Sequence, residues 1–166
     1  MWLRSAGLVE RVDVMMTRSA TRFVTPLMME LASGNPVWLD TFEQQGAIRI
    51  PHVELTRQAD LLVVMPATAN ALSRAATGAG ADLVSNAILA APCPVVLIPS
   101  MNEVMWEKRA VQRNVELCRD AGYHVVEPAT GYRVAALRRE FGGMPDAPEI
   151  LSELRGVLAA AVTVPG

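Results

Sequence analysis

The sequence predicts an α/β fold in which helices cover both faces of a parallel sheet. Two short apolar runs, residues 61–65 and 95–98, carry this prediction. Each run is too short for a helix, is rich in Val, Leu and Ile, and is apolar on both faces, which is typical of a buried strand in a parallel sheet. Segments with helical patterns alternate with these runs, as they do in a parallel α/β domain. The length fits a single domain over residues 1–166.

Two polar loops follow the predicted strands and mark the expected site. Residues 66–70 read PATAN and residues 99–102 read PSMN. In open parallel sheets, ligands bind at the carboxyl ends of the strands, so both loops are expected at one edge. The first loop offers backbone N–H groups, a hydroxyl and a carboxamide that could hold a flat heterocycle, or it is a turn with a capping Thr. Asn102 could hold a carboxylate beside helix N–H groups, or serve as an N-cap.

Capping residues, prolines and glycines predict where the other elements begin and end. The expected helices span residues 1–7, 19–33, 52–59, 69–77, 83–90 and 103–121, and a last helix begins at residue 146 or 148 and runs to about residue 161. Short strands are also expected at residues 11–16 and 123–126. Pro26 is expected to break the second helix, and residues 127–148 are expected to be loop-like.

The chain begins within what we interpret as a first helix. A domain of this kind usually opens with a strand and a glycine-rich turn that binds phosphate. The expectation is that Met1 is internal to a longer chain or that this version lacks its first strand.

Composition argues against several classes of protein. Hydrophobic residues make up 51% of the chain, charged residues 19%, and the net charge is −2. Without a long basic run, nucleic-acid binding is not expected. The longest apolar run, residues 87–99, contains three prolines and is not expected to span a membrane. Since no signal-peptide pattern opens the chain, a cytoplasmic location is expected, with Cys93 and Cys118 as free, buried thiols.

Histidine and carboxylate positions suggest an acid–base site without a metal. His52 stands at a predicted helix start in IPHVEL and could be a general base near neutral pH, or it could be structural. His124, in the last predicted strand, is expected to be a core or interface residue. Glu54, Asp60 and Asp82 are too dispersed to suggest a metal cluster.

The order of IPHVEL, ADLLVVMPATAN, GADLVSNAIL and PSMNEVMW resembles the homo-oligomeric flavin-containing cysteine decarboxylase family. PATAN is similar to its PASANT motif, and PSMNEVMW to its P-x-M-N-x-x-M-W motif. MMTRSATRFVTP resembles the segment of that family that meets FMN. The resemblance covers about residues 1–150. It implies a flavodoxin-like, Rossmann-type fold that binds FMN between subunits of a trimer, often within a dodecamer of four trimers.

The resemblance also implies roles for particular residues. His52 matches the family's base, Asn102 matches the residue that holds the substrate carboxylate, and Met105 lies in the same motif. The implied cofactor-binding residues are Thr17, Ser19, Phe23, Pro66, Ala67, Thr68, Asn70, Ser100 and Met101. No metal ligand is implied.

The segment that resembles the family's substrate clamp, residues 127–148, carries the prediction of substrate. In the family, FMN-dependent oxidation of a cysteine lets its carboxylate leave as CO₂ and yields an enethiol. The branch that acts on phosphopantothenoylcysteine reduces the enethiol with a clamp Cys, and PATGYRVAALRREFGGMP has none. It resembles the clamp of lantibiotic-type peptidyl-cysteine decarboxylases. The resemblance therefore predicts a precursor peptide with a C-terminal Cys as substrate.

Three alternatives stay open. They are phosphopantothenoylcysteine decarboxylation in coenzyme A synthesis, a non-catalytic flavin-binding regulatory subunit, and a flavin prenyltransferase. The prenyltransferase is less favoured because its site does not need the P-x-M-N-x-x-M-W motif. The presence of His52 and Asn102 argues against a non-catalytic subunit.

Overall fold

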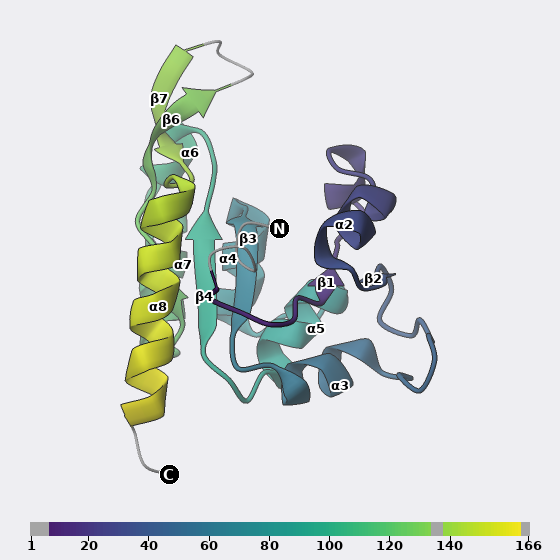
Figure 1. Cartoon of the computed structure of the whole chain (residues 1–166). Coiled ribbons are helices and arrows are strands. Elements are labelled where there is room, and N and C mark those ends of the chain that lie inside the picture. Colours follow the sequence, from purple (N-terminus) through teal and green to yellow (C-terminus); the bar gives the residue numbers. More distant parts are fainter. Residues whose placement is uncertain (1–6, 134–137, 164–166) are drawn as a thin grey trace. The chain divides into compact units, whose positions relative to one another are not determined.

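Parallel strands followed by helices build the protein, as the computed structural model in Figure 1 shows for residues 7–133 and 138–163. The chain divides into two compact units, which are described separately. The first comprises Met1–Ala59 and Gly80–Pro92, and the second comprises Asp60–Ala79 and Cys93–Gly166. Strands pair in parallel in both units, so the prediction of an α/β fold with a parallel sheet is confirmed.

In the first unit, strands β1 (Val14–Met15) and β2 (Val37–Trp38) pair in parallel. The 3-10 helix η1 (Ala20–Arg22) and helix α2 (Pro26–Ser33) connect them. Pro26 occupies the first turn of α2 and Thr25 caps it, because the Thr25 hydroxyl accepts a hydrogen bond from the N–H of Met28. The predicted break at Pro26 is therefore confirmed, whereas the predicted strand over residues 11–16 is shorter than expected.

Helices α3 (Pro51–Gln58) and α5 (Leu83–Ala90) complete the first unit and pack against each other. Its core contains Trp38, Leu55 and Leu83, with Met15 and Ile48 beside them. These side chains come from β1, β2, both helices and the connection before α3. Burial of this apolar surface therefore ties the elements together.

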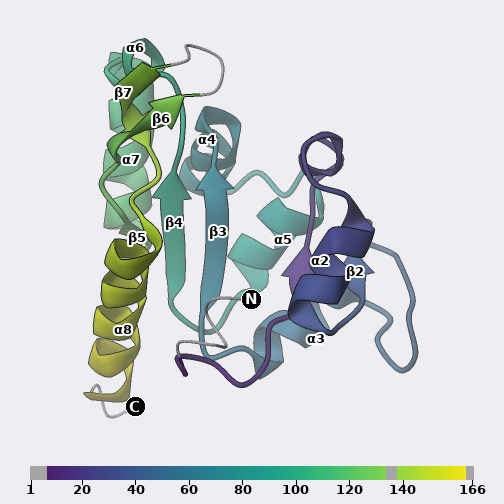
Figure 2. The same ribbon diagram turned by 45° about the horizontal axis from the view of Figure 1, so that its top comes forward.

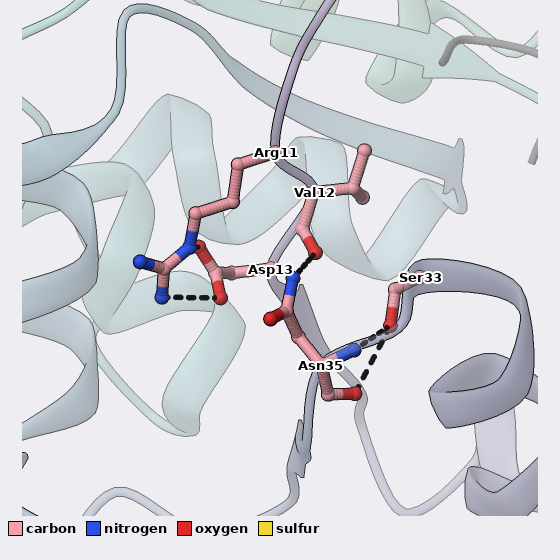
Figure 3. A network of polar contacts seen from close by, with 5 residues as sticks. All are labelled: Arg11, Val12, Asp13, Ser33 and Asn35. Atoms are coloured by element: carbon pink, nitrogen blue, oxygen red, sulfur yellow. Dashed lines mark hydrogen bonds and ion pairs between the residues drawn. The ribbon is translucent and has the colours of Figure 1, made fainter. Parts of the chain in front are cut away.

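A polar network joins the start of β1 to the turn after α2 (Figure 3). The Nδ2 of Asn35 donates to the carbonyl oxygen of Val12 at 2.8 Å, and its N–H donates to the Ser33 hydroxyl at 3.2 Å. Arg11 and Asp13 form a two-pronged ion pair at 2.7 and 2.9 Å. The segment that leads into β1 is thus fastened to the turn that leads into β2.

The second unit contains a parallel sheet in the order β3 (Leu62–Ala67), β4 (Val95–Pro99) and β5 (His124–Val125). Figure 2 shows β3 and β4 side by side and pointing the same way. All residues of β4 are buried, as its apolar sequence predicts. Strand β3 lies at the edge of this sheet, and it is less buried than predicted, with Met65 exposed. Helices α4 (Ala69–Thr77) and α7 (Arg109–Asp120) pack against each other.

Two predictions for the second unit are wrong. The helix expected over residues 103–121 is divided into α6 (Glu103–Trp106) and α7. Lys108 is extended between them, and the Nε2 of Gln112 donates to the Trp106 carbonyl at 2.6 Å. This side chain supplies a donor to the end of α6, so the helix can stop without leaving that carbonyl unpaired.

The segment expected to be loop-like is a hairpin of antiparallel strands β6 (Ala129–Arg133) and β7 (Arg138–Gly143). Local pairing between the two strands satisfies their backbone groups despite three glycines in the segment. Helix α8 (Ala147–Thr163) follows and is the longest described helix.

Other predictions can be compared directly with the described residues. The bounds of α4 and α5 agree with the predicted ranges, and both cysteines are free. Cys118 is buried, whereas Cys93 is half-buried, so the expectation of two buried thiols holds for one of them. Among the described helices, none is long and apolar enough to cross a membrane. The helix predicted at the start of the chain falls largely on residues 1–6, outside the described part.

Candidate functional site

The turn between β3 and α4 contains the first group of predicted cofactor residues. Ala67 is fully buried, and Pro66, Thr68 and Asn70 are exposed. The Thr68 hydroxyl accepts a hydrogen bond from the N–H of Ala71 at 3.3 Å, so Thr68 caps α4. The capping role that the sequence left open is therefore real. Asn70 lies in the first turn of α4 with its carboxamide accessible to a ligand.

The loop after β4 lies beside this turn. The N–H of Ser100 donates to the Ala67 carbonyl at 3.1 Å, so the two loops meet at the carboxyl edge of the sheet as predicted. The N–H of Met101 donates to the carbonyl oxygen of Gly142 at 2.9 Å, which joins the loop to β7. Gly142 has a φ of +95°, a conformation in which a residue with a side chain would be strained.

Asn102 begins α6 and uses its side-chain oxygen for capping. Its Oδ1 accepts a hydrogen bond from the N–H of Val104 at 2.9 Å. Among the described residues, no hydrogen bond engages its Nδ2, and the residue is exposed. The capping bond orients the carboxamide and leaves its NH₂ group as a donor. Met105 exposes 47% of its surface one turn later, whereas Trp106 is buried and anchors α6.

His52 belongs to the first unit and sits in the first turn of α3, after Pro51. Its Nδ1 is buried and has no hydrogen-bond partner among the described residues. Buried polar atoms are nearly always paired, so a nitrogen left unpaired in this way is typical of a ligand or proton-transfer site. The Thr56 hydroxyl donates to the His52 carbonyl at 2.5 Å and fixes the backbone beneath the ring.

Glu54 orders the segment just before His52. Its carboxylate accepts hydrogen bonds from the N–H groups of Arg49 and Ile50 at 2.9 and 3.0 Å. These bonds favour the ionised form and lower the pKa of Glu54 below its ordinary value. Sequence reasoning did not assign this role, although a Glu in the first turn of a predicted helix is a known capping signal.

The segment after β1 contains the other predicted cofactor residues. The Thr17 hydroxyl accepts a hydrogen bond from the N–H of Ala20 at 3.2 Å and shapes the turn into η1. Ser19, at the start of the helix predicted over residues 19–33, is exposed and makes no side-chain capping bond. Phe23 leaves 89% of its surface exposed. A large aromatic side chain so exposed, beside other exposed apolar residues, indicates a binding surface.

The predicted site residues thus fall into two groups. In the second unit, the loops at residues 66–70 and 99–102 are joined to each other and to β7. In the first unit, His52 lies on α3, and the Thr17–Phe23 segment follows β1. Sequence reasoning missed the contribution of Gly142, for which the glycine pair before Met144 was the available signal. No group of metal-ligating side chains occurs among the described residues.

These parallel strands and their loops define an α/β protein with a candidate ligand site at the carboxyl edge of a sheet, where ligands bind in open parallel sheets. The family model described as Flavoprotein matches residues 6–159. The chain belongs to the Flavoprotein family.

A curated relative and two solved structures refine this assignment. The chain is 46% identical over 140 residues to the coenzyme A biosynthesis bifunctional protein CoaBC of Mycobacterium tuberculosis, covering 84% of this chain and 33% of that protein. It therefore spans about a third of the length of the curated relatives it matches. The crystal structure of SpaF, described as an FMN-dependent cysteine decarboxylase, is 36% identical with a TM-score of 0.79, covering 98% of this chain and 86% of SpaF. A PPC decarboxylase variant complexed with pantothenoylaminoethenethiol is 26% identical with a TM-score of 0.72, covering 87% of this chain and 81% of that one.

The comparisons confirm some predictions and overturn another. The flavodoxin-like fold is confirmed by the SpaF structure, and a flavin cofactor agrees with membership in the Flavoprotein family. The predicted lantibiotic-type branch, with a precursor peptide as substrate, is wrong. The CoaBC relatives, which include a Bacillus subtilis protein at 41% identity over 121 residues, support the coenzyme A alternative instead.

Proposed function

We propose that the chain catalyses FMN-dependent decarboxylation of phosphopantothenoylcysteine in coenzyme A synthesis. The similarity to CoaBC at 46% identity carries this proposal. The solved PPC decarboxylase complex with pantothenoylaminoethenethiol adds a structural relative that holds a ligand of this chemical type. Asn102 and His52 supply the two groups that decarboxylation requires, a holder for the carboxylate and an acceptor for a proton.

The described residues fit a bound flavin. Asn70 and the Ser100 segment present polar groups at the edge of the sheet, and Phe23 offers an exposed aromatic surface. An isoalloxazine ring is flat and has one polar edge, so a carboxamide suits its edge and an aromatic side chain suits its face. Thr17, Ser19, Pro66, Ala67, Thr68 and Met101 are the other residues proposed to surround it. When bound, FMN would supply the electron sink for oxidation of the cysteine.

Asn102 is proposed to hold the substrate carboxylate. Its Oδ1 is committed to the N–H of Val104, so the Nδ2 has a defined direction and is available to donate. A neutral donor binds the carboxylate without the strong attraction of a cation, which would oppose the loss of CO₂. Met105, exposed on the same short helix, would pack against the apolar part of the substrate.

His52 is proposed to accept the proton released when the cysteine is oxidised. Its unpaired Nδ1 is buried, so a proton bound there does not exchange freely with solvent. The hydrogen bonds of Glu54 and Thr56 hold the two ends of its helical turn. A positioned base of this kind contributes about 10²–10⁴-fold to a reaction rate.

Three further features belong to the proposal. The chain acts as a homo-oligomer, a trimer in the simplest case, and the exposed apolar side chains of α2 support such an assembly. It works as one domain over residues 1–166, with the β6–β7 hairpin as the substrate clamp. Its place of action is the cytoplasm.

The test is incubation of FMN-loaded protein with phosphopantothenoylcysteine, followed by mass spectrometry. The proposed clamp, residues 127–148, contains no cysteine. We therefore expect the enethiol, with a mass loss of about 46 Da from CO₂ and two hydrogens, together with bleaching of the flavin. A loss of about 44 Da would still establish decarboxylation and would show that the enethiol is reduced. Bound flavin without any loss of CO₂, or turnover confined to cysteine peptides, would overturn the proposal.

A further inference from the structure

A group of exposed cations lies at the start of α7 and just before it. Lys108, Arg109 and Arg113 are exposed, and none forms an ion pair within the described part of the chain. At the opposite end of the same helix, Arg119 pairs with Glu127. The chain has more acidic than basic residues, 17 against 15, so a shortage of carboxylates does not explain the difference.

The two arginines face a depression in the surface. Arg109 and Arg113 are four residues apart, which places them on the same side of the helix, where like charges repel. They line a depression of about 610 Å³ together with Ala110, Gln112 and Glu116. The Gln112 carboxamide is already committed to the Trp106 carbonyl at 2.6 Å. The charged donors in the depression are the two guanidinium groups.

This chemistry selects a phosphate monoester. A guanidinium group presents parallel N–H donors that match two phosphate oxygens, and two such groups can neutralise a dianion. All five residues that line the depression belong to α7, so it is an open groove along one side of that helix. Glu116 would repel a bare anion but can accept a hydrogen bond from a hydroxyl or amide of an attached organic group. The arrangement thus favours an ester over inorganic phosphate.

We propose that Arg109 and Arg113 bind the phosphate end of the substrate whose carboxylate is held at Asn102. This inference rests on the proposed function and assigns its substrate preference. Asn102 and Arg109 lie in the same unit and are seven residues apart, so the chain between them spans at most about 25 Å. A substrate with two anionic ends meets a chain with a net charge of −2, and local cations offset that repulsion.

The experiment compares phosphorylated and unphosphorylated pantothenoylcysteine with the wild-type protein and Arg109→Gln/Arg113→Gln. For the double variant we expect kcat/KM with the phosphorylated substrate to fall about 10- to 100-fold, mainly through KM, as befits lost hydrogen bonds to a charged group. With the unphosphorylated substrate we expect a change of less than about twofold. Equal losses for both substrates, or no loss for either, would overturn the assignment.

Two control variants sharpen the result. Arg119→Gln removes the same charge from the same helix at a paired, exposed position, and its kinetics should match the wild type within about twofold. Glu116→Gln removes the carboxylate in the depression and should lower KM for the phosphorylated substrate. A higher KM for Glu116→Gln would contradict the proposed direction of the charge effect.

Binding without turnover separates this inference from the proposed function. Calorimetry would measure the affinity of wild type and double variant for phosphopantothenate and for pantothenate, which both lack the cysteine. Preference for phosphopantothenate in the wild type, lost in the double variant, supports the site even if no substrate is decarboxylated. Equal affinity of both proteins for phosphopantothenate refutes it even if turnover is observed.

Discussion

His52 combines a rigid backbone position with a ring nitrogen that has no partner. The Thr56 hydroxyl and the Glu54 carboxylate order the turn around it, but neither contacts Nδ1. We predict that His52→Asn keeps the fold and bound flavin but lowers kcat by about 10²–10⁴-fold, since a positioned base is removed. Steady-state kinetics and the flavin absorbance spectrum would measure the two effects separately.

The matched control is His124→Asn. His124 is exposed and contacts Glu153 at 3.0 Å, on elements that do not contribute to the proposed site. Its replacement should leave kcat within about twofold, because an exposed pair contributes little. If His52→Asn retained activity comparable to this control, the role of His52 would be structural.

Asn102 permits a substitution that separates capping from substrate binding. In Asn102→Asp the side-chain oxygen can still accept from the N–H of Val104, and Asp is as good an N-cap as Asn. We predict an unchanged melting temperature and a kcat/KM at least about tenfold lower, because a carboxylate cannot donate and repels the substrate's carboxylate. Thermal unfolding and kinetics on the same preparation would test this. A lower melting temperature with normal kinetics would contradict it.

The hydrogen bonds of the Glu54 carboxylate should make the folding stability depend on pH. Its pKa is lowered from the ordinary value of 4.5 by hydrogen bonds from Arg49 and Ile50, so the folded protein favours the ionised form. The stabilisation is present above pH 4.5 and is lost as the pH falls through the lower, folded pKa. We predict that Glu54→Gln is less stable than the wild type near neutral pH and that the difference shrinks in acid. Urea unfolding of both proteins at several pH values would test this. A difference in the free energy of unfolding that does not change with pH would contradict it.

At the scale of elements, short-range chemistry determined which predictions were correct. The bounds of α4 and α5 could be predicted because Thr68 and Asp82 cap them through their own side chains. The division between α6 and α7 could not, since it depends on the Gln112 side chain reaching back to Trp106. The β6–β7 hairpin depends on pairing between strands, for which residues 127–148 carry no clear alternation of apolar and polar residues. The meeting of the two loops was predictable from parallel strands, but the unpaired Nδ1 of His52 was not.

The network of Figure 3 makes one element dependent on another. Asn35 links the start of β1 to the turn before β2 through its bond to Val12. We predict that Asn35→Ala lowers the free energy of unfolding by about 1–2 kcal/mol, because a half-buried carbonyl loses its donor. Arg11→Ala, which breaks an exposed ion pair in the same network, should cost less than about 1 kcal/mol. Chemical denaturation of both variants would test the order, and the reverse order would contradict it.

At the scale of the whole molecule, the error in substrate class has a physical cause. The prediction gave most weight to the absence of one cysteine from residues 127–148, since a thiol there determines whether an enethiol is reduced. That residue affects the last chemical step and not the binding of the substrate. Similarity to CoaBC extends over 84% of the chain and therefore rests on many positions rather than one. A single reactive residue was a weaker guide to substrate than the chain as a whole.

The exposed apolar surface beside α2 predicts that copies of the chain assemble. Five large apolar side chains in α2 and in the segment just before it are exposed, with Phe23 at 89%, Leu31 at 72% and Leu27 at 62%; the other two are Val24 and Met28. Leu27, Met28 and Leu31 are spaced along one side of α2, and Phe23 and Val24 precede them, so together they form an apolar patch that a monomer would leave in water. We predict that light scattering shows an oligomer, a trimer or a multiple of it. The double variant Leu27→Lys/Leu31→Lys should give a smaller species, because buried unpaired lysines oppose association.

The control is Leu117→Lys, at an exposed apolar position on α7, which should leave the mass unchanged. A wild-type protein that is monomeric and binds FMN, or a double variant with the wild-type mass, would show that this patch does not hold copies of the chain together.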